Sequence, residues 1–374
     1  MKIAIDARSL TTRPTGVGHS LMAALNVWSG QRPDIEFMLM AHKPIHPQAL
    51  HALRVAPNIS FTCCPASVMP GNGLWWFLHA FPAKARQLGA THLWGASGVL
   101  PPFAFAHFTT VLTVNDLVFL SMPDTMAWRT RVAYRLLAGR SITHADLIWA
   151  ISHFTAGEVE RNYPKRLAKG FIVGCGLNPL RQQDLPDDQT LESLKQRFGV
   201  GDRTLLFVGT LEPRKNLPFL LSLMPALAQK GWRLLVVGCS GWGQSQLASS
   251  LQAPGYPSAA VHFCDYVTDL ELQALYRTVT FFISTSLMEG FGLPQLEAMS
   301  AGCPVIAAAN SAVIEVVADG GLLIEGWNQA HWIEQIEQAY AHRPALQAAA
   351  KQNAERHSVA PACLAVSAAL ARTT

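Results

Sequence analysis

Short apolar runs alternate with longer helix-like stretches along almost the whole chain of 374 residues. In the first half, runs rich in Ile, Val, Leu and Phe cover residues 2–7, 35–41, 59–64, 91–96, 109–116 and 146–152. Strands that are buried on both faces of a parallel sheet have this composition. The alternation therefore predicts a doubly wound α/β fold, in which helices cover both faces of a mostly parallel sheet.

A change of composition divides the chain into two parts. Residues 176–189 are rich in Pro, Asp and Gln, which is typical of an interdomain linker. Apolar runs resume at residue 204, and from residue 332 onward the Ala-, Gln- and Leu-rich sequence predicts helices. A chain of this length exceeds one ordinary core. We therefore expect two Rossmann-like domains, residues 1–178 and 179–345, followed by helices over residues 346–374.

Composition and charge exclude several classes of protein. Half of the residues are hydrophobic and 14% are charged, so the chain can bury a core and disorder is not expected. No run of 18 or more apolar residues and no signal peptide is present, so we expect a cytoplasmic protein. The net charge of +4 is too small to indicate nucleic-acid binding, and the seven cysteines lack metal-type spacing, which favours buried thiols.

Two adjacent cations follow the first strand of the second half. The loop "TLEPRKNL", residues 210–217, carries Arg214 and Lys215. An arginine fork beside a lysine charge can neutralise a diphosphate in place of a divalent metal. A solvated turn is the simpler explanation for two such residues taken alone.

The stretch "SLMEGFGLPQLEAMSAGCPV", residues 286–305, strengthens the first interpretation. Glu289 lies in a glycine-rich loop, and Glu297 is predicted in the first turn of a helix that begins at Pro294. The start of a helix attracts an anion, and carboxylates accept hydrogen bonds from sugar hydroxyls. This spacing predicts a site for an extended, hydroxylated and phosphorylated ligand. Two glutamates could instead be the acid and nucleophile of a glycosidase, but hydrolysis would have no use for the two cations.

Together, "GTLEPRKN", "EGFGLPQLEAMSAGCPV" and the earlier "TVNDLVFL" resemble the retaining, GT-B-fold glycosyltransferases that carry the E-x7-E motif. The resemblance implies two Rossmann-like domains that face each other across a cleft, final helices that cross back to the first domain, a nucleotide-sugar donor and no essential metal. It also implies roles for individual residues. Arg214 and Lys215, after Gly209, would hold the donor diphosphate, Glu289 the donor sugar and Glu297 the ribose.

The same resemblance assigns further donor contacts. The backbone at Gly290, Phe291, Gly292 and Leu293 would assist Glu289, and the backbone at Tyr266 and Val267 would contact the nucleobase, although Asp265 replaces the usual glycine before the aromatic residue. In the first half, Gly16 and Gly18 of "TRPTGVGHSL" form a loop that, in this family, approaches the donor phosphate. A pair of glycines alone would equally fit a tight turn.

One residue departs from the family pattern. Asn115 precedes Asp116 where these enzymes usually have a His-Asp pair. An asparagine can donate a hydrogen bond to a sugar hydroxyl but cannot carry a proton. The resemblance implies that the leaving phosphate accepts the acceptor proton, so the reaction does not require a histidine here. His19 and His153 are expected to be surface or helix-end residues, and Ser152 to cap a helix.

The resemblance favours a mannosyltransferase of surface-polysaccharide or lipopolysaccharide assembly, with GDP-mannose as the first expectation for the donor and UDP- or dTDP-hexoses as alternatives. Aromatic and basic residues over 74–88 and 128–140 would suit an anionic membrane surface and a polyprenyl-diphosphate-linked acceptor, or they could belong to ordinary amphipathic helices. A nucleotide-sugar epimerase and a non-catalytic binding protein of a polysaccharide assembly complex are the alternative functions.

Overall fold

The computed structural model describes residues 1–54, 56–63, 73–125, 128–164, 171–182, 186–238, 245–252, 255–264 and 267–372. The chain divides into two compact units. One contains residues 1–182 and 358–374, and the other contains residues 183–357. The sequence placed the first boundary four residues earlier, after residue 178. It placed the last helices from residue 346, whereas the helix at residues 343–354 belongs to the second unit and only the final helix belongs to the first.

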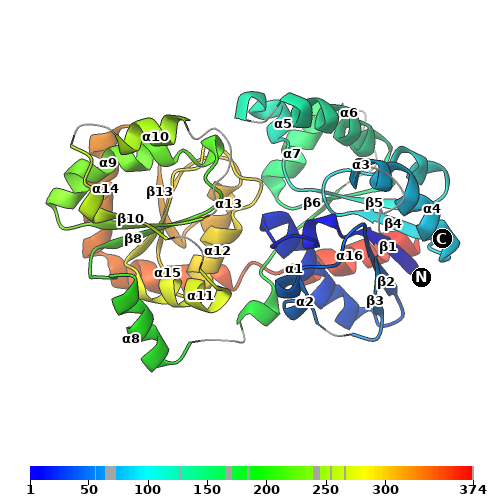
Figure 1. The fold of residues 1–374 in the computed structure, drawn as a ribbon, viewed down its shortest axis with the longest axis horizontal. Helices are drawn as coiled ribbons and strands as arrows, with labels where there is room; N and C mark the ends of the chain where they lie inside the picture. Colours follow the sequence, from blue (N-terminus) through cyan, green and yellow to red (C-terminus); the bar gives the residue numbers. More distant parts are fainter. Residues whose placement is uncertain are drawn as a thin grey trace. The chain divides into compact units, whose positions relative to one another are not determined.

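The first unit is built on a parallel sheet, which lies between two layers of helices (Figure 1). Among the described residues its strand order is β3-β2-β1-β4-β5-β6-β7. The strands are β1 Lys2–Asp6, β2 Glu36–Ala41, β3 Ile59–Cys63, β4 His92–Gly95, β5 Thr109–Val114, β6 Leu147–Ala150 and β7 Ile172–Val173. The helices are η1 Arg8–Leu10, α1 Gly16–Gln31, α2 Pro47–His51, α3 Gly73–Trp75, η2 Trp76–Ala80, α4 Phe81–Gln87, η3 Pro102–Ala106, α5 Val118–Ser121, η4 Pro123–Thr125, α6 Trp128–His144, α7 His153–Asn162, η6 Pro179–Gln182 and α16 Ala360–Ala371.

Each face of this sheet has its own apolar core. One core joins α1 and α16 to the sheet, and the indole of Trp28 in α1 donates a hydrogen bond of 2.6 Å to Ser367 in α16. The other core contains Trp76, Phe77 and Phe81, packed on the opposite face. Because α16 completes the first core, the end of the chain is part of the first unit (Figure 1).

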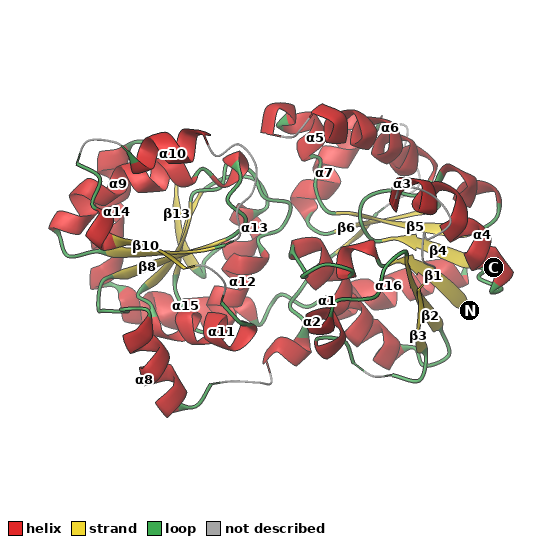
Figure 2. Cartoon of the chain, in the orientation of Figure 1, coloured by secondary structure: helices red, strands yellow, loops and turns green. Residues whose placement is uncertain are grey.

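The second unit repeats the architecture, with strands enclosed by helices (Figure 2). Its described strands follow the order β10-β9-β8-β11-β12-β13, and all of them are parallel. The strands are β8 Thr204–Val208, β9 Arg233–Val237, β10 Val261–Cys264, β11 Phe281–Ser284, β12 Val305–Ala308 and β13 Gly321–Ile324. The helices are α8 Asp188–Arg197, η7 Pro213–Lys215, α9 Leu217–Gln229, α10 Ser245–Leu251, η8 Ser258–Ala260, α11 Asp269–Thr278, α12 Leu293–Ser300, α13 Val313–Val317, α14 Gln329–Ala341 and α15 Arg343–Ala354.

The strand order reverses at one point in each sheet, between β1 and β4 and between β8 and β11. Ligands of such sheets bind beyond the carboxyl ends of the strands, beside the point of reversal. The loops after β8 and β11 carry the charged motifs of the sequence. The loop after β5, next to β4, carries Asn115 and Asp116.

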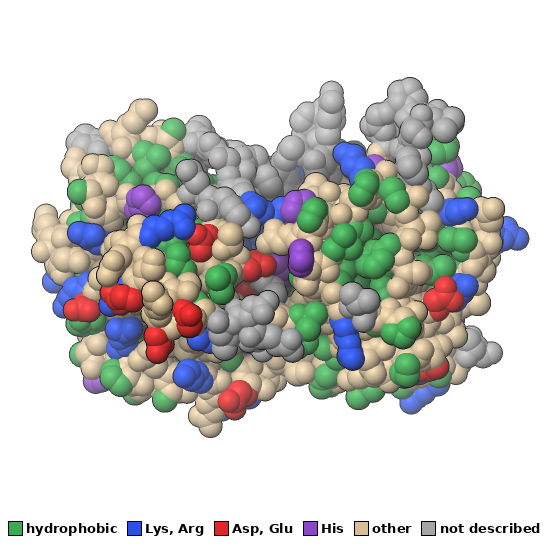
Figure 3. Space-filling model, turned by 60° about the horizontal axis from the view of Figure 1, so that its bottom comes forward, with side chains coloured by type: hydrophobic (Ala, Val, Ile, Leu, Met, Phe, Trp, Pro, Cys, Tyr) green, Lys and Arg blue, Asp and Glu red, His purple; other side chains and the backbone are tan. Residues whose placement is uncertain are grey.

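The two units also differ in surface composition. On the face drawn in Figure 3, the second unit, on the left, shows Lys, Arg, Asp and Glu side chains close to one another, whereas the first unit shows more hydrophobic and fewer charged side chains. No helix in the described part of the chain combines the length and the hydropathy that a membrane crossing requires.

Candidate active site

The charged group of the second unit is centred on Glu289, in the loop after β11. Its carboxylate accepts hydrogen bonds from the Lys215 Nζ at 2.5 Å and the Arg214 Nη1 at 2.8 Å, both from the short helix η7 after β8. The Ser286 hydroxyl donates a third bond to the carboxylate at 2.6 Å. The structure therefore brings together three residues that the sequence predicted for one site and adds Ser286.

Burial alone would raise the pKa of Glu289, but the charges of Lys215 and Arg214 and the hydrogen bonds from Lys215 and Ser286 outweigh it and lower the pKa to about 2. The carboxylate is 6% exposed and stays ionised at neutral pH. A general acid must hold a proton at working pH, so Glu289 is unsuited to the acid role in the glycosidase alternative.

Arg214 is held from both sides. Its Nη2 donates to Glu212 at 2.6 Å, and its Nη1 also donates to the backbone oxygen of Met288 at 2.6 Å. The four charged side chains of this group, Glu212, Arg214, Lys215 and Glu289, carry two positive and two negative charges. Partners on two strand ends fix the guanidinium and the ammonium before any ligand binds, which is the arrangement that preorganises a site for an anion.

Two glycines let the ends of β8 and β9 approach each other. A Cβ atom added to Gly238 would lie 1.9 Å from the backbone oxygen of Gly209, and one added to Gly209 would lie 3.4 Å from the Lys215 Cε. The close approach therefore requires a glycine at position 238, whereas a Cβ atom on Gly209 would be in ordinary van der Waals contact with the Lys215 side chain. Gly238 was not predicted, although a glycine directly after an apolar run is a signal of close backbone approach.

A polar pair after β12 supports the Glu289 loop. The backbone N–H of Glu289 donates to the Ser311 hydroxyl at 2.9 Å, and Asn310 donates to the backbone oxygen of Ser286 at 2.9 Å. Ser311 has a φ of 48°, a left-handed conformation that is uncommon for serine. Sequence reasoning missed both residues. Their signal was the pair of polar side chains directly after a buried strand.

Helix α12 begins one residue earlier than predicted, at Leu293, after Gly292 with a φ of 111°. Gly290, Phe291 and Gly292 are buried, and their loop connects Glu289 to the start of α12. Glu297 therefore lies in the second turn and not in the first, because the helix starts before Pro294. Its carboxylate accepts a hydrogen bond of 3.2 Å from the hydroxyl of Tyr276 in α11.

The segment predicted to contact the nucleobase is described in part. Val267 is buried and precedes Thr268, which caps α11 in a capping box with Glu271. Asp265 and Tyr266 lie outside the described residues.

The first unit carries the remaining predicted residues. Gly16 and Gly18 lie within the first turn of α1 and not in a loop before it, because the helix already starts at Gly16. A Cβ atom on Gly18 would lie 3.1 Å from the backbone oxygen of Ser9, so this position requires a close approach, whereas a Cβ on Gly16 would meet nothing within 4 Å. The predicted cap Ser152 is confirmed, since it accepts a hydrogen bond of 2.9 Å from the N–H of Thr155.

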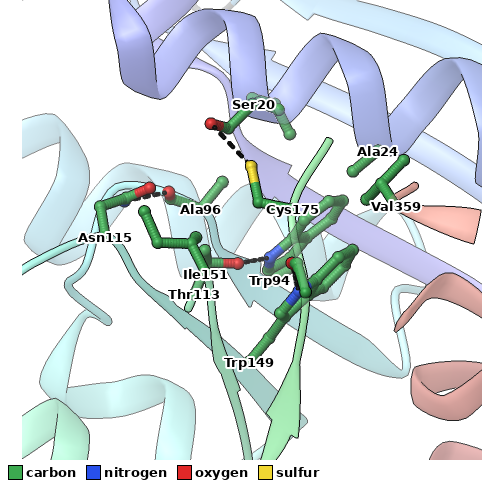
Figure 4. A pocket seen from close by; sticks show the side chains of 12 residues that line it. Ser20, Ala24, Trp94, Ala96, Thr113, Asn115, Trp149, Ile151, Cys175 and Val359 are labelled. Carbon is green, nitrogen blue, oxygen red and sulfur yellow. Dashed lines mark hydrogen bonds between the residues drawn. The ribbon is translucent and has the colours of Figure 1, made fainter. Parts of the chain in front are cut away.

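Asn115 and Asp116 follow β5, and each forms a different hydrogen bond. The Asn115 amide donates to the backbone oxygen of Ala96 at 3.1 Å and lines a pocket with Trp94, Trp149 and Cys175 (Figure 4). The Asp116 carboxylate accepts a bond of 3.1 Å from the N–H of Val118, at the start of α5.

A further charged pair at the end of β1 was not predicted. Arg8 donates two hydrogen bonds to the buried carboxylate of Asp6, at 2.9 and 2.8 Å, and its guanidinium carbon lies 3.9 Å from the centre of the Phe77 ring. The sequence predicted a strand over residues 2–7, which includes Asp6, and assigned no role to Arg8 in the "IDAR" sequence. Its signal was a charged pair at the carboxyl end of an apolar run.

Comparison with known proteins identifies a matching family and related sequences. Residues 188–357 match the model of the family described as glycosyl transferases group 1. The O-antigen chain mannosyltransferase B of Escherichia coli is 31% identical over 224 residues, which cover 58% of this chain and 57% of that protein. A D-inositol 3-phosphate glycosyltransferase of Salinispora arenicola is 28% identical over 58% of this chain and 52% of its own length. The chain thus matches little more than half the length of these two relatives.

Two solved structures resemble the whole chain. Anabaena HepE, in complex with UDP and glucose, has a TM-score of 0.75 at 18% identity, with 99% of each chain covered. WaaG, a glycosyltransferase involved in lipopolysaccharide biosynthesis, has a TM-score of 0.71 at 15% identity, with 98% of each chain covered. These likenesses confirm the predicted GT-B fold. Residues 188–357 therefore form a domain of the glycosyltransferase group 1 family.

Proposed function

We propose that this protein is a retaining glycosyltransferase that moves a hexose from a nucleotide sugar to a hydroxyl group of a glycan acceptor in surface-polysaccharide or lipopolysaccharide biosynthesis. The observation that carries the proposal is the ion cluster of Arg214, Lys215 and Glu289 at the ends of β8 and β11, inside the group 1 domain. The names of the Escherichia coli relatives favour mannose, and GDP-mannose is the proposed donor.

In this proposal Arg214 and Lys215 bind the donor diphosphate. The fork of Arg214 suits two phosphate oxygens, and Lys215 adds a compact charge, so the residues would stabilise the departing nucleoside diphosphate without an essential metal. When the diphosphate enters, it competes with Glu289 for both cations. The carboxylate, released from the two cations, is then available to accept hydrogen bonds from the donor sugar.

The proposed reaction proceeds on one face of the sugar. The bond between the anomeric carbon and the diphosphate oxygen breaks, the acceptor oxygen bonds to the same carbon, and the acceptor proton passes to the departing diphosphate. No protein base is needed in this scheme, which agrees with an asparagine at position 115. The acceptor is assigned to the first unit, and Glu297, on α12, is assigned to the ribose.

The proposal extends to a lipid-linked acceptor and a location on the inner face of the cell membrane. Its support is a row of exposed apolar side chains on the first unit. The rings of Trp75 and His79 lie 5.5 Å apart, those of His79 and Phe103 lie 5.7 Å apart, and Trp75 and Phe103 are 40% and 55% exposed. Arg131 and Arg135 of α6 would supply positive charge toward anionic lipids. Sedimentation with anionic liposomes tests this extension. Failure of the wild type to sediment, with activity on a lipid acceptor intact after charge reversal at both arginines, would exclude it.

A thermal-shift panel of GDP, UDP, dTDP and ADP sugars tests the donor site. A ligand that binds only the folded protein raises its unfolding temperature. We expect one nucleotide series to stabilise the wild type and to lose its effect in Arg214→Ala and Glu289→Ala. The matched control is Arg203→Ala, which removes an ion pair with Glu337 in the same unit but should keep the nucleotide response. If no nucleotide sugar stabilises the wild type, the proposed donor site is wrong.

Product analysis separates the proposal from its rivals. A retaining transferase yields a product with the anomeric configuration of the donor, which NMR coupling constants report. Conversion of the donor sugar without an acceptor would instead indicate an epimerase. If Glu289→Ala left the cellular polysaccharide unchanged, the non-catalytic alternative would replace the enzyme.

A further inference from the structure

The pocket beside Asn115 differs chemically from the charged site in the second unit. It lies within the first unit, beyond the ends of β4, β5 and β6, and its empty volume is about 290 Å³, part of which is open to solvent. Most of its lining is apolar. These lining residues are Leu21, Ala24, Trp94, Ala96, Trp149, Ile151 and Val359. The part of this space that a water molecule can occupy is only about 10 Å³, close to the room of one water molecule, so the pocket suits a single small group and not a whole sugar.

The indole and thiol groups of the pocket already have partners (Figure 4). The Trp94 indole donates to the Thr113 hydroxyl at 2.8 Å, and the Trp149 indole donates to the Gly174 oxygen at 2.7 Å. The Cys175 sulfur lies 3.6 Å from the Ser20 hydroxyl, and burial raises the pKa of this thiol to about 11, so it is neutral at neutral pH. No charged side chain is among the lining residues that the structure describes.

The pocket opens on the side of its polar residues. Ser20, Asn115 and Gly174 are partly exposed, whereas the other lining residues are buried. Figure 4 shows Ser20 and Asn115 on one side of the pocket and the Trp94 and Trp149 rings on another. A ligand group that enters past Asn115 would therefore reach an apolar, uncharged interior. A hydroxyl group there would lose its hydrogen bonds to water and find few new partners, whereas the burial of a methyl group is favourable.

We propose that this pocket receives the methyl group of a methyl-bearing acceptor sugar, either the C6 methyl of a 6-deoxyhexose or the methyl of an N-acetyl group. The inference rests on the proposed function, in which the first unit binds the acceptor. It makes Ser20, Ala96 and Cys175 specificity-determining residues, because they shape the space that the methyl group occupies.

Saturation-transfer NMR on the full chain tests the inference without requiring turnover. One pair of probes is methyl α-D-rhamnoside and methyl α-D-mannoside, which differ only in the C6 hydroxyl. The other is the methyl β-glycosides of N-acetylglucosamine and glucose. We expect the sugar methyl of one pair to receive the strongest saturation, and its glycoside to bind at least about tenfold more tightly than its partner, as for one methylene in an apolar pocket. The pair that responds identifies the source of the methyl group.

Two substitutions fill the pocket from different elements. Ser20→Leu on α1 and Ala96→Val after β4 should each abolish the methyl preference. Ser222→Leu, at an exposed position of α9, makes the same change outside the pocket and should preserve it. The unfolding temperature of each variant shows whether it folds, and one folded variant is enough to test the methyl preference. Equal signals within both pairs, no signal from the sugar methyls, or a preference that survives in a folded pocket variant would overturn the inference. Geranyl phosphate, a short isoprenoid, serves as a lipid probe. If its branch methyl groups alone were saturated, the inference would also be overturned.

The same samples separate this inference from the proposed function. If a nucleotide sugar binds the wild type but not Arg214→Ala, while the glycosides show no methyl preference, the donor site stands and the pocket inference fails. If the methyl preference is found but no nucleotide sugar binds, the pocket is a sugar site and the proposed transferase is wrong.

Discussion

The two units place different chemistry at the carboxyl ends of their parallel strands. In the second unit, the loops after β8 and β11 meet in a cluster of ion pairs with Glu289 at its centre. In the first unit, the ends of β4, β5 and β6 surround an apolar pocket whose thiol is neutral. A parallel sheet thus fixes where a ligand binds, and the side chains at the strand ends decide which kind of ligand it is.

The difference also concerns what holds each site in place. The charged cluster depends on each cation having its carboxylate, since a buried charge without a partner is costly. The pocket depends on packing and on indole hydrogen bonds, which no single charge controls. Electrostatic substitutions should therefore affect the charged cluster strongly and the pocket weakly.

The largest effect is expected for Glu289→Gln. Lys215 is 9% exposed and would lose its carboxylate partner, and Arg214 would keep only that of Glu212, so the free energy of unfolding of the second unit should fall by about 3–5 kcal/mol. Urea unfolding measures the change. The comparison variant is Glu337→Gln, whose ion pair with Arg203 is more exposed and should contribute at most about 1 kcal/mol. Equal losses in the two variants would show that the cluster is no more important than a surface pair.

Acid should act through the same carboxylate. The pKa of Glu289 is lowered from 4.5 to about 2 in the folded protein, against the effect of burial, by Lys215 and Arg214. Stability from this group is therefore complete above pH 4.5 and is lost as the pH falls toward 2, an effect of about 3 kcal/mol. Urea unfolding between pH 6 and pH 2, over about the range of this titration, should show a steeper loss for wild type than for Glu289→Gln. Parallel curves would mean that Glu289 does not titrate in this way.

The sequence predicts the site of one unit better than that of the other, because the two sites are assembled differently. Arg214, Lys215 and Glu289 lie in two short motifs that follow strands, so the β/α alternation alone places them at one sheet edge. Their mutual ion pairs did not follow from the sequence, because spacing does not reveal which side chains meet when no ligand is bound. The start of α12 was predicted within one residue, yet that residue moves Glu297 into the second turn.

The pocket of the first unit could not be predicted in this way. Its walls come from α1, from three strand ends, from the segment after β7 and from Val359, close to the end of the chain. No local motif joins these positions, and the tryptophans are indistinguishable from core residues in the sequence. Asn115 was recognised only as a departure from a family pattern. Its place at the opening of an apolar pocket depends on packing among distant segments.

A smaller effect is expected for Arg214→Lys. The substitution keeps the charge and removes the planar fork, so the affinity for a nucleoside diphosphate should fall by about tenfold while the protein remains folded. Isothermal titration calorimetry with the nucleotide identified by the thermal-shift panel measures the change. The methyl preference of the first unit should be unaffected, which makes it an internal control. Unchanged nucleotide affinity would indicate that Arg214 acts only as a point charge.

The smallest effect concerns the neutral thiol of the pocket and requires no substitution. Cys175 is 6% exposed, and burial raises the pKa of its thiol to about 11, so the thiolate, the reactive form, is about 0.1% of the total at pH 8. Cys63 is exposed at the end of β3. Brief alkylation of the native protein, followed by peptide mass spectrometry, should therefore modify Cys63 well before Cys175. Similar rates at the two cysteines would show that water enters the pocket and that the Cys175 thiol ionises there. An apolar interior would then no longer distinguish the first unit from the second.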